Sequence, residues 1–414
     1  IIFSGIQTLE GSGADTLAGR DQDNAWSVVS AGGGRVQRHL ESGAVQDVVN
    51  FSGMSTLVGR SQKDIFTVEE GGSIADIQGG EGDNELRAVS NPGDTVSWTL
   101  NDENSGGPVI REFGDNEPRD ASTLVTTFSD IQNLTGSDGS DQFLVQGDAS
   151  LSGVLDGGAG ANSLDFSAWE GVEGEALNIG FGATDFTWNL KGINEVTGNG
   201  ADSTLGLAYG SNVWTLDQAN GGTISHAAGE GESELFAGDL TFTNFGNLQG
   251  GSGDDEFTLT STGSISGTID GGSESGNTLT VAGAGNVWRW DHDGETHAAV
   301  SQDENVRVGA FSDFQTLTGS GSDQFFGHDQ TTYWTLSTDA RWSLSSSEAE
   351  ADGYLTLSGM NNVTGGTGDD HFTLQSGATY TGEIDGGAQA DGSTSTNTLA
   401  INGDPSLWHL DGRT

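Results

Sequence analysis

Glycine-rich turns that end on an aspartate are the places where residue type and spacing suggest chemistry. Two of them, 250–258 and 365–373, follow the nine-residue pattern Gly-Gly-x-Gly-x-Asp-x-apolar-x, and near matches end at other aspartates. Glycine permits positive φ, so carbonyl oxygens can point into a turn to which aspartate adds charge. Such turns suit Ca²⁺, which takes six to eight hard oxygen ligands. The candidate ligands are Asp15, Asp64, Asp141, Asp255, Asp323 and Asp370.

A second kind of turn carries asparagine and follows an aspartate turn in the longer repeats. Its asparagines are Asn84, Asn162, Asn277 and Asn397, which lie 20, 21, 22 and 27 residues after Asp64, Asp141, Asp255 and Asp370. If successive turns stack, each asparagine lies over an aspartate at one corner, and their oxygens can hold an ion. The same residue types also cap turns and form side-chain ladders along a corner. For any single turn we favour the capping interpretation.

The nine-residue turns resemble the calcium-binding repeats of the RTX (haemolysin-type) secreted proteins. The array as a whole resembles the giant extracellular repeat proteins and adhesins of bacteria. The resemblance implies an extracellular protein, with calcium as the expected cofactor. In the RTX family the nonapeptides run in tandem, whereas here each aspartate turn stands tens of residues from the next. The continuous calcium roll of that family is therefore not expected in this chain.

A longer motif, aromatic/Leu-x-x-apolar-x-x-Leu/Val-x-Gly, recurs seven times and defines the repeats. Copies start near 3, 51, 128, 190, 242, 311 and 357. Their spacing approximates whole multiples of about 24 residues, as expected for a solenoid that gains entire coils. The sequence therefore predicts an all-β fold, a right-handed parallel β-helix of about 17 coils. We expect a single continuous solenoid over 1–414, as a fragment of a longer protein. The alternative is a β-propeller of seven unequal blades.

Each repeat also contains Trp-x-apolar, as at 26–28, 98–100, 214–216 and 334–336. Alternation of this kind is typical of a half-buried strand. Two interpretations of the tryptophans are open. They fill the interior at a wide corner, or exposed rings stack on sugars. Their regular placement favours the interior.

The composition excludes several functional classes. Acids outnumber bases 61 to 13, which gives a formal charge of −48. This charge disfavours nucleic acid and anionic membranes as partners. The chain has no cysteine, so neither disulfides nor thiolate chemistry is expected. No apolar run is long enough for a transmembrane helix, and we expect no membrane insertion.

These features predict a structural or adhesive β-solenoid, such as a stalk, matrix, filament or adhesin segment, outside the cell or on a bacterial cell surface. The expected partners are neighbouring repeats or further copies end to end, together with surface glycans. One alternative is a calcium-binding RTX-like module. Another is a polysaccharide-active β-helix enzyme, but the arginines form no cluster suited to a lyase, and we expect no enzymatic activity.

Overall fold

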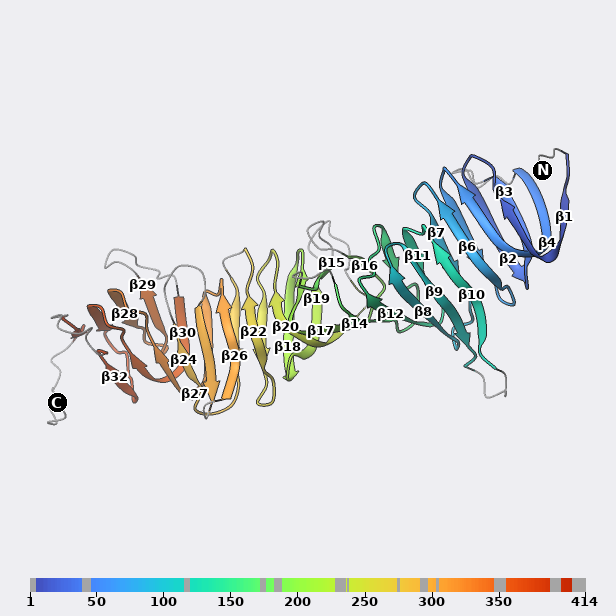
Figure 1. Ribbon diagram of the computed structural model, residues 1–414. Coiled ribbons are helices and arrows are strands. Elements are labelled where there is room, and N and C mark those ends of the chain that lie inside the picture. Colours follow the sequence, from blue (N-terminus) through green and yellow to red (C-terminus); the bar gives the residue numbers. More distant parts are fainter. Residues whose placement is uncertain are drawn as a thin grey trace. The chain divides into compact units, whose positions relative to one another are not determined.

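The computed structural model describes residues 5–38, 46–114, 120–171, 176–181, 188–227, 236, 238–273, 276–290, 297–302, 305–345, 355–387 and 396–403. These residues form strands, turns and bends and no helix, so the chain is all-β, as the sequence predicts. They belong to two compact units, unit 1 (1–208 and 233–245) and unit 2 (209–232 and 246–414). Figure 1 shows the strands of both. The predicted repeat start at Phe3 and the motif at Trp408 lie outside the described residues.

The strands range in length from three to 15 residues. Unit 1 contains β1 (Thr8–Ala18), β2 (Asn24–Ser30), β3 (Gly33–Arg38), β4 (Gln46–Arg60), β5 (Asp64–Val68), β6 (Ile74–Gly80), β7 (Glu85–Ala88), β8 (Thr95–Asp102), β9 (Ser105–Glu112), β10 (Ser122–Ser129), β11 (Asn133–Thr135), β12 (Ser140–Gly147), β13 (Val154–Asp156), β14 (Ser163–Trp169), β15 (Asn178–Phe181), β16 (Asn189–Lys191) and β17 (Glu195–Leu207). Strand β20 (Asp239–Gln249) contributes residues to both units. Unit 2 contains β18 (Ser211–Gln218), β19 (Gly221–Ala227), β21 (Glu256–Leu259), β22 (Ile265–Asp270), β23 (Thr278–Val281), β24 (Val287–Arg289), β25 (His297–Gln302), β26 (Asn305–Ser312), β27 (Thr316–Phe326), β28 (Thr332–Leu336), β29 (Trp342–Ser345), β30 (Leu355–Thr364), β31 (Asp370–Leu374), β32 (Glu383–Asp385) and β33 (Thr398–Ile401).

Parallel pairing in register stacks the apolar residues of successive strands into columns. A column in unit 1 consists of Trp26, Phe66, Leu86, Leu134, Leu155 and Leu190. A column in unit 2 consists of Trp214, Phe257, Leu279, Leu317 and Leu357. Every member of both columns is buried. These columns are part of the apolar core, because alternate residues of each strand point to the same side.

Antiparallel hairpins interrupt the parallel pairing. Strands β2 and β3, β8 and β9, β18 and β19, β24 and β25, and β28 and β29 pair antiparallel. The second strand of a hairpin also pairs antiparallel with the strand that follows it, as in β3–β4, β9–β10, β25–β26 and β29–β30. The result is one large mixed sheet.

The hairpins change the predicted repeat length. Residues paired in parallel are 20 positions apart at Phe66 and Leu86, but 40 apart at Trp26 and Phe66, where a hairpin intervenes. A parallel β-helix of about 17 coils of about 24 residues is therefore not confirmed. The Trp-x-apolar alternation has a period of two residues in parallel and antiparallel strands alike. The sequence pattern could not distinguish a hairpin from an additional coil.

In every copy of the repeat-defining motif, the residue at the third position has a positive φ in the left-handed region, and the chain turns there. The seven residues there are Gly5, Gly53, Asp130, Gly192, Asn244, Asp313 and Gly359, with φ between 56° and 71°. Glycine, asparagine and aspartate are the residue types that tolerate this conformation best. The motif thus specifies a corner as well as a strand.

Close approach of the backbone depends on the glycine that ends the motif, such as Gly250, and on the glycine of the turns between motif copies, such as Gly79. A Cβ on Gly79 would collide with the carbonyl oxygen of Asp130, and a Cβ on Gly250 would lie 2.5 Å from the carbonyl oxygen of Gly271. Both carbonyls belong to the next corner along the array. Only a residue without a side chain lets neighbouring corners stack at this distance.

We predict that Gly79→Ala destabilises the chain by about 1–3 kcal/mol, as overpacked substitutions do. Gly93→Ala is the matched control, because a Cβ there meets no atom within 4 Å. Its effect should stay within about 0.5 kcal/mol. Chemical denaturation followed by circular dichroism measures both changes. Equal midpoints for the two variants would contradict the close approach.

Candidate functional site

The predicted aspartates occupy buried positions beside the corner glycines. Asp64, Asp141, Asp255, Asp323 and Asp370 are at most 1% exposed. The Oδ2 atom of Asp255 lies 2.6 Å from the point where a Cβ of Gly250 would be, and that of Asp64 lies 2.5 Å from the corresponding point on Gly59. The glycine of each turn therefore makes room for the carboxyl group. Asp15 differs from the other five because it is exposed, with Ser12 donating to its Oδ2 from both N–H and Oγ.

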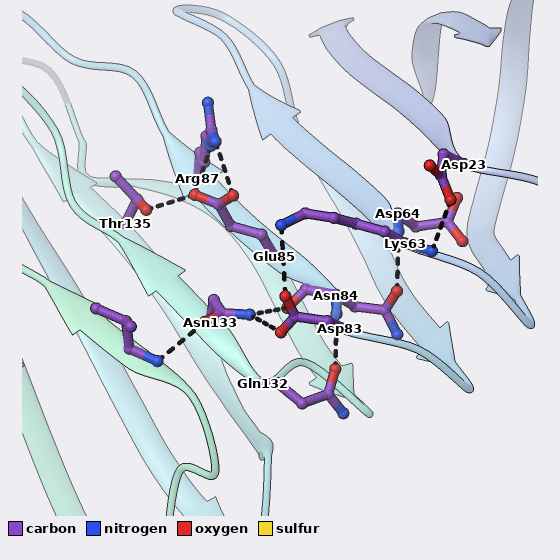
Figure 2. Close-up of polar contacts among 11 residues, drawn as sticks. Asp23, Lys63, Asp64, Asp83, Asn84, Glu85, Arg87, Gln132, Asn133 and Thr135 are labelled. Carbon is purple, nitrogen blue, oxygen red and sulfur yellow. Dashed lines mark hydrogen bonds and ion pairs between the residues drawn. The ribbon is translucent and has the colours of Figure 1, made fainter. Parts of the chain in front are cut away.

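The structure brings together all four predicted pairs of aspartate and asparagine. In each pair the backbone N–H of the aspartate donates to the Oδ1 of the asparagine one turn further along (Figure 2 for Asp64 and Asn84). The distances are 2.9 Å for Asp64–Asn84, 2.8 Å for Asp141–Asn162, 2.8 Å for Asp255–Asn277 and 2.9 Å for Asp370–Asn397. This contact uses the amide oxygen of the asparagine to cap the backbone of the aspartate turn.

The series continues beyond the asparagine, and we call it the corner ladder. The N–H of Asn84 donates to Oε1 of Gln132 at 2.8 Å, and the N–H of Asn277 donates to Oε1 of Gln315 at 3.0 Å. The Nδ2 of Asn84 donates to the carbonyl oxygen of Asp130 at 3.1 Å. Along the corner ladder, a backbone N–H of each turn therefore donates to a side-chain oxygen of the next turn. In unit 1, Asp64 begins β5, and Asn84 and Gln132 directly precede β7 and β11 (Figure 2).

On its other side the aspartate receives hydrogen bonds from the preceding strand, and the sequence analysis missed these donors. The Nε1 of a tryptophan donates to the carboxylate in four turns, from Trp26 to Asp64 at 2.9 Å, Trp98 to Asp141 at 2.9 Å, Trp288 to Asp323 at 3.2 Å and Trp334 to Asp370 at 3.1 Å. The Nδ2 atoms of Asn24, Asn212 and Asn286 also donate to Asp64, Asp255 and Asp323. The sequence signal for these donors was the motif Asn-x-Trp, which occurs at 24–26, 212–214 and 286–288.

One near match to the aspartate turn has a different residue at the corner. Asp202 is exposed, and the neighbouring Ser203 is buried. The Oγ of Ser203 lies 2.8 Å from the point where a Cβ of Gly198 would be, and it donates to the carbonyl oxygen of Asn244 at 3.1 Å. A hydroxyl therefore fills the position of the carboxyl group in this turn.

Burial raises the pKa of the carboxyls of Asp64, Asp141, Asp255 and Asp370. Loss of solvation raises the pKa of Asp255 to about 7, and it raises the pKa of Asp64 and of Asp370 to about 6 each. The pKa of Asp141 is raised for the same reason. Hydrogen bonds from Trp26 and Asn24 to Asp64 act in the opposite direction, because they stabilise the ionised carboxylate.

Two of the turn aspartates have a buried carboxylate oxygen without a hydrogen-bond donor. Oδ2 of Asp64 and Oδ2 of Asp255 are buried and accept no hydrogen bond. The carbonyl oxygen of Gly271 lies 2.5 Å from the position that a Cβ of Gly250 would take, and Oδ2 of Asp255 lies 2.6 Å from the same position. A calcium ion needs six to eight oxygens. In the described part of the chain, no three His, Asp or Glu side chains gather in a way that would hold a metal ion.

The tryptophans are part of the interior. Trp26, Trp98, Trp214 and Trp334 are at most 1% exposed. Their rings stack nearly parallel on those of Phe66, Phe143, Phe257 and Phe372, at centroid distances of 5.6 Å or less. The interpretation that these rings stack on sugars is therefore wrong. A buried indole N–H needs a hydrogen-bond acceptor, and for Trp26, Trp98 and Trp334 the aspartate carboxyl is that acceptor.

Comparisons with known proteins do not assign this chain to a family. No protein-family model matches the chain, and no curated protein matches it either. Within the described residues, no helix is long and apolar enough to span a membrane.

We predict that stability falls as the pH rises from about 4 to about 8. The folded turns bind protons more tightly than unfolded aspartates, so protonation favours the folded state over this range. The raised pKa of Asp255 makes it the largest contributor, at about 1.4 kcal/mol per pKa unit. Asp255→Asn should reduce the difference between unfolding midpoints at pH 5 and pH 8, since asparagine does not titrate.

Asp217→Asn is the control for this experiment. It removes the same charge from an exposed position of unit 2 and should leave the pH dependence unchanged. Both variants are melted in chelator-containing buffer and followed by circular dichroism. A midpoint that rises with pH, or an Asp255→Asn profile equal to that of the parent chain, would refute the prediction.

Proposed function

We propose that the chain is a β-solenoid segment of a secreted bacterial repeat protein, acting as an extracellular stalk, matrix element, filament or adhesin. The observation that carries the proposal is the series of in-register columns, in which each parallel strand adds its apolar residue to that of the preceding repeat. Such stacking extends a structure in one direction, since each repeat contacts its neighbours. The hairpins are lateral additions to this arrangement.

The pairing favours a solenoid over a propeller. Each blade of a propeller is its own small sheet, whereas here ladders continue from repeat to repeat, as from β7 through β11 and β13 to β16. Crossovers between parallel strands are right-handed in nearly all proteins, and we propose that hand here.

A structural role suits the distribution of charge and of perturbed groups. The formal charge of −48 keeps such an array soluble and disfavours polyanionic partners. The carboxyls with strongly raised pKa lie in corner ladders, where they accept hydrogen bonds from Asn24, Trp26 and Asn212. We therefore propose a non-catalytic protein whose partners are neighbouring repeats or copies end to end, together with surface glycans.

Calcium binding is the second candidate function, favoured by one observation. Oδ2 of Asp64 and Oδ2 of Asp255 are buried without a hydrogen bond, and an ion would satisfy them. In that case the turns would act as the sites of a calcium-responsive module. Calcium takes six to eight oxygen ligands, and no three acidic or histidine side chains gather as a metal site among the described residues. We therefore rank calcium binding after the structural role.

The proposed architecture predicts elongated particles in negative-stain images of the purified chain. Small-angle scattering of the same sample should give a pair-distance distribution with a long tail. The physical reason is that repeats added along one axis increase length at constant width. Ring-shaped or disc-shaped particles would exclude the solenoid, and with it the stalk or filament role.

A chelator experiment separates the two candidates. The structural proposal predicts equal melting midpoints in EDTA and in about 5 mM Ca²⁺, above the ~1 mM constants of weak extracellular sites. The reason is that the corner ladder forms through hydrogen bonds alone. A calcium-dependent rise that disappears in Asp64→Asn/Asp255→Asn would establish the calcium-binding module instead.

A further inference from the structure

One cross-strand row of unit 2 departs from its counterpart in unit 1. Both rows run across four parallel strands and begin with an arginine. The unit 1 row is Arg87, Thr135, Asp156 and Lys191. The unit 2 row is Arg289, Phe326, Thr364 and Asp385. The rows differ at every position after the arginine, and in unit 2 the second position is the aromatic Phe326.

The two arginines have different neighbours. Arg87 forms a two-point ion pair with Glu85, with distances of 2.6 and 2.7 Å, and Thr135 donates to the same carboxylate (Figure 2). Val287 stands two residues before Arg289, where Glu85 stands relative to Arg87. The exposed Arg289 forms no ion pair with any described residue. Its guanidinium lies 4.6 Å from the ring centre of Phe326.

Arg289 and Phe326 border a cavity of about 340 Å³. Asp329, Thr364 and Asp385 also line it, and the glycines of the 365–366 turn leave the space open. The volume is at the lower end of the range for small-molecule sites. The cavity therefore has room for one sugar ring.

The two carboxylates in this cavity are held in place by the backbone. Oδ1 of Asp329 accepts the N–H of Thr367 at 3.1 Å, and Oδ1 of Asp385 accepts the N–H of Gly387 at 3.0 Å. Both side chains are exposed, so their second oxygens can accept hydrogen bonds from a ligand. The cavity thus combines two oriented acceptors, a guanidinium donor and part of an aromatic ring.

We propose that this cavity binds a neutral hexose unit of a glycan. Hydroxyl groups of the sugar donate to Asp329 and Asp385, Arg289 donates to a sugar oxygen, and the C–H face of the ring contacts Phe326. The two carboxylates and the formal charge of −48 disfavour an anionic ligand. The inference deepens the proposed adhesive function and rests on it, because it names the class of surface ligand.

The experiment uses the whole chain and three neutral disaccharides, maltose, cellobiose and lactose. Saturation-transfer NMR detects contact, and isothermal titration calorimetry measures the dissociation constant. At least one disaccharide should bind saturably. Arg289→Ala and Asp385→Asn should each weaken binding about tenfold, as expected for the loss of a hydrogen bond with a charged partner. Digalacturonate should not compete.

Matched controls come from the corresponding row of unit 1. Arg87→Ala changes the first position of the unit 1 row, as Arg289→Ala changes that of the unit 2 row. Asp156→Asn changes the same type of turn as Asp385→Asn, since Oδ1 of Asp156 accepts the N–H of Gly158 as Oδ1 of Asp385 accepts that of Gly387. These variants should bind like the parent chain. Circular dichroism confirms that all variants fold.

Several outcomes overturn the assignment. They are no saturable binding of any neutral disaccharide, binding of digalacturonate alone, or equal affinity in the Arg289→Ala and parent chains. Failure here leaves elongated particles in negative stain intact, so the glycan site and the solenoid fail independently of each other.

Discussion

The close stacking of backbone corners is the constraint on which the other features of this structure depend. A carbonyl oxygen of one corner occupies the space where a side chain of the preceding glycine would begin, as at Gly79 and Asp130. Once corners approach this closely, parallel strands come into register, and their apolar residues must stack. The aromatic pairs such as Trp214 and Phe257, with ring centres 4.9 Å apart, follow from that register. Glycine is therefore frequent because the corners need it.

The order of side chains along a corner follows from their hydrogen-bonding capacity. An indole N–H on the first strand of a hairpin needs an acceptor, and an aspartate on the strand paired parallel to it supplies one, as Asp64 does for Trp26. The N–H of that aspartate in turn needs an acceptor, which the amide oxygen of Asn84 supplies. Asparagine can then donate onward through Nδ2 to the carbonyl of Asp130, which an ionised aspartate cannot do. Donor and acceptor alternate along the corner ladder, and the second carboxylate oxygen of Asp64 and of Asp255 is left without a hydrogen bond.

The sequence predicted the parts of this arrangement that depend on local spacing. It indicated an all-β chain, the turn aspartates and the asparagine that follows each of four of them. It did not predict the hairpins, because strand alternation has the same period in either direction. It also missed the indole donors, since Trp26 and Asp64 are 38 residues apart and meet only through register. The row at Arg289 depends on the same long-range pairing, and only the three-dimensional structure reveals its cavity.

The raised pKa values and the calcium alternative arise from the same geometry. At the asparagine turns, Nδ2 faces a carbonyl oxygen and donates to it, as Asn162 does to Gly192 at 2.8 Å. At the aspartate turn of 250–255 a carboxyl oxygen takes the corresponding place, so that Oδ2 of Asp255 and the carbonyl oxygen of Gly271 lie within 2.6 Å of one point above Gly250. Both atoms are hydrogen-bond acceptors, and Oδ2 of Asp255 accepts no hydrogen bond. The loss of solvation at this buried position favours the protonated carboxyl group, whereas a bound cation would need further oxygen ligands. We therefore expect the aspartate turns to be the part of the array whose stability depends most on pH.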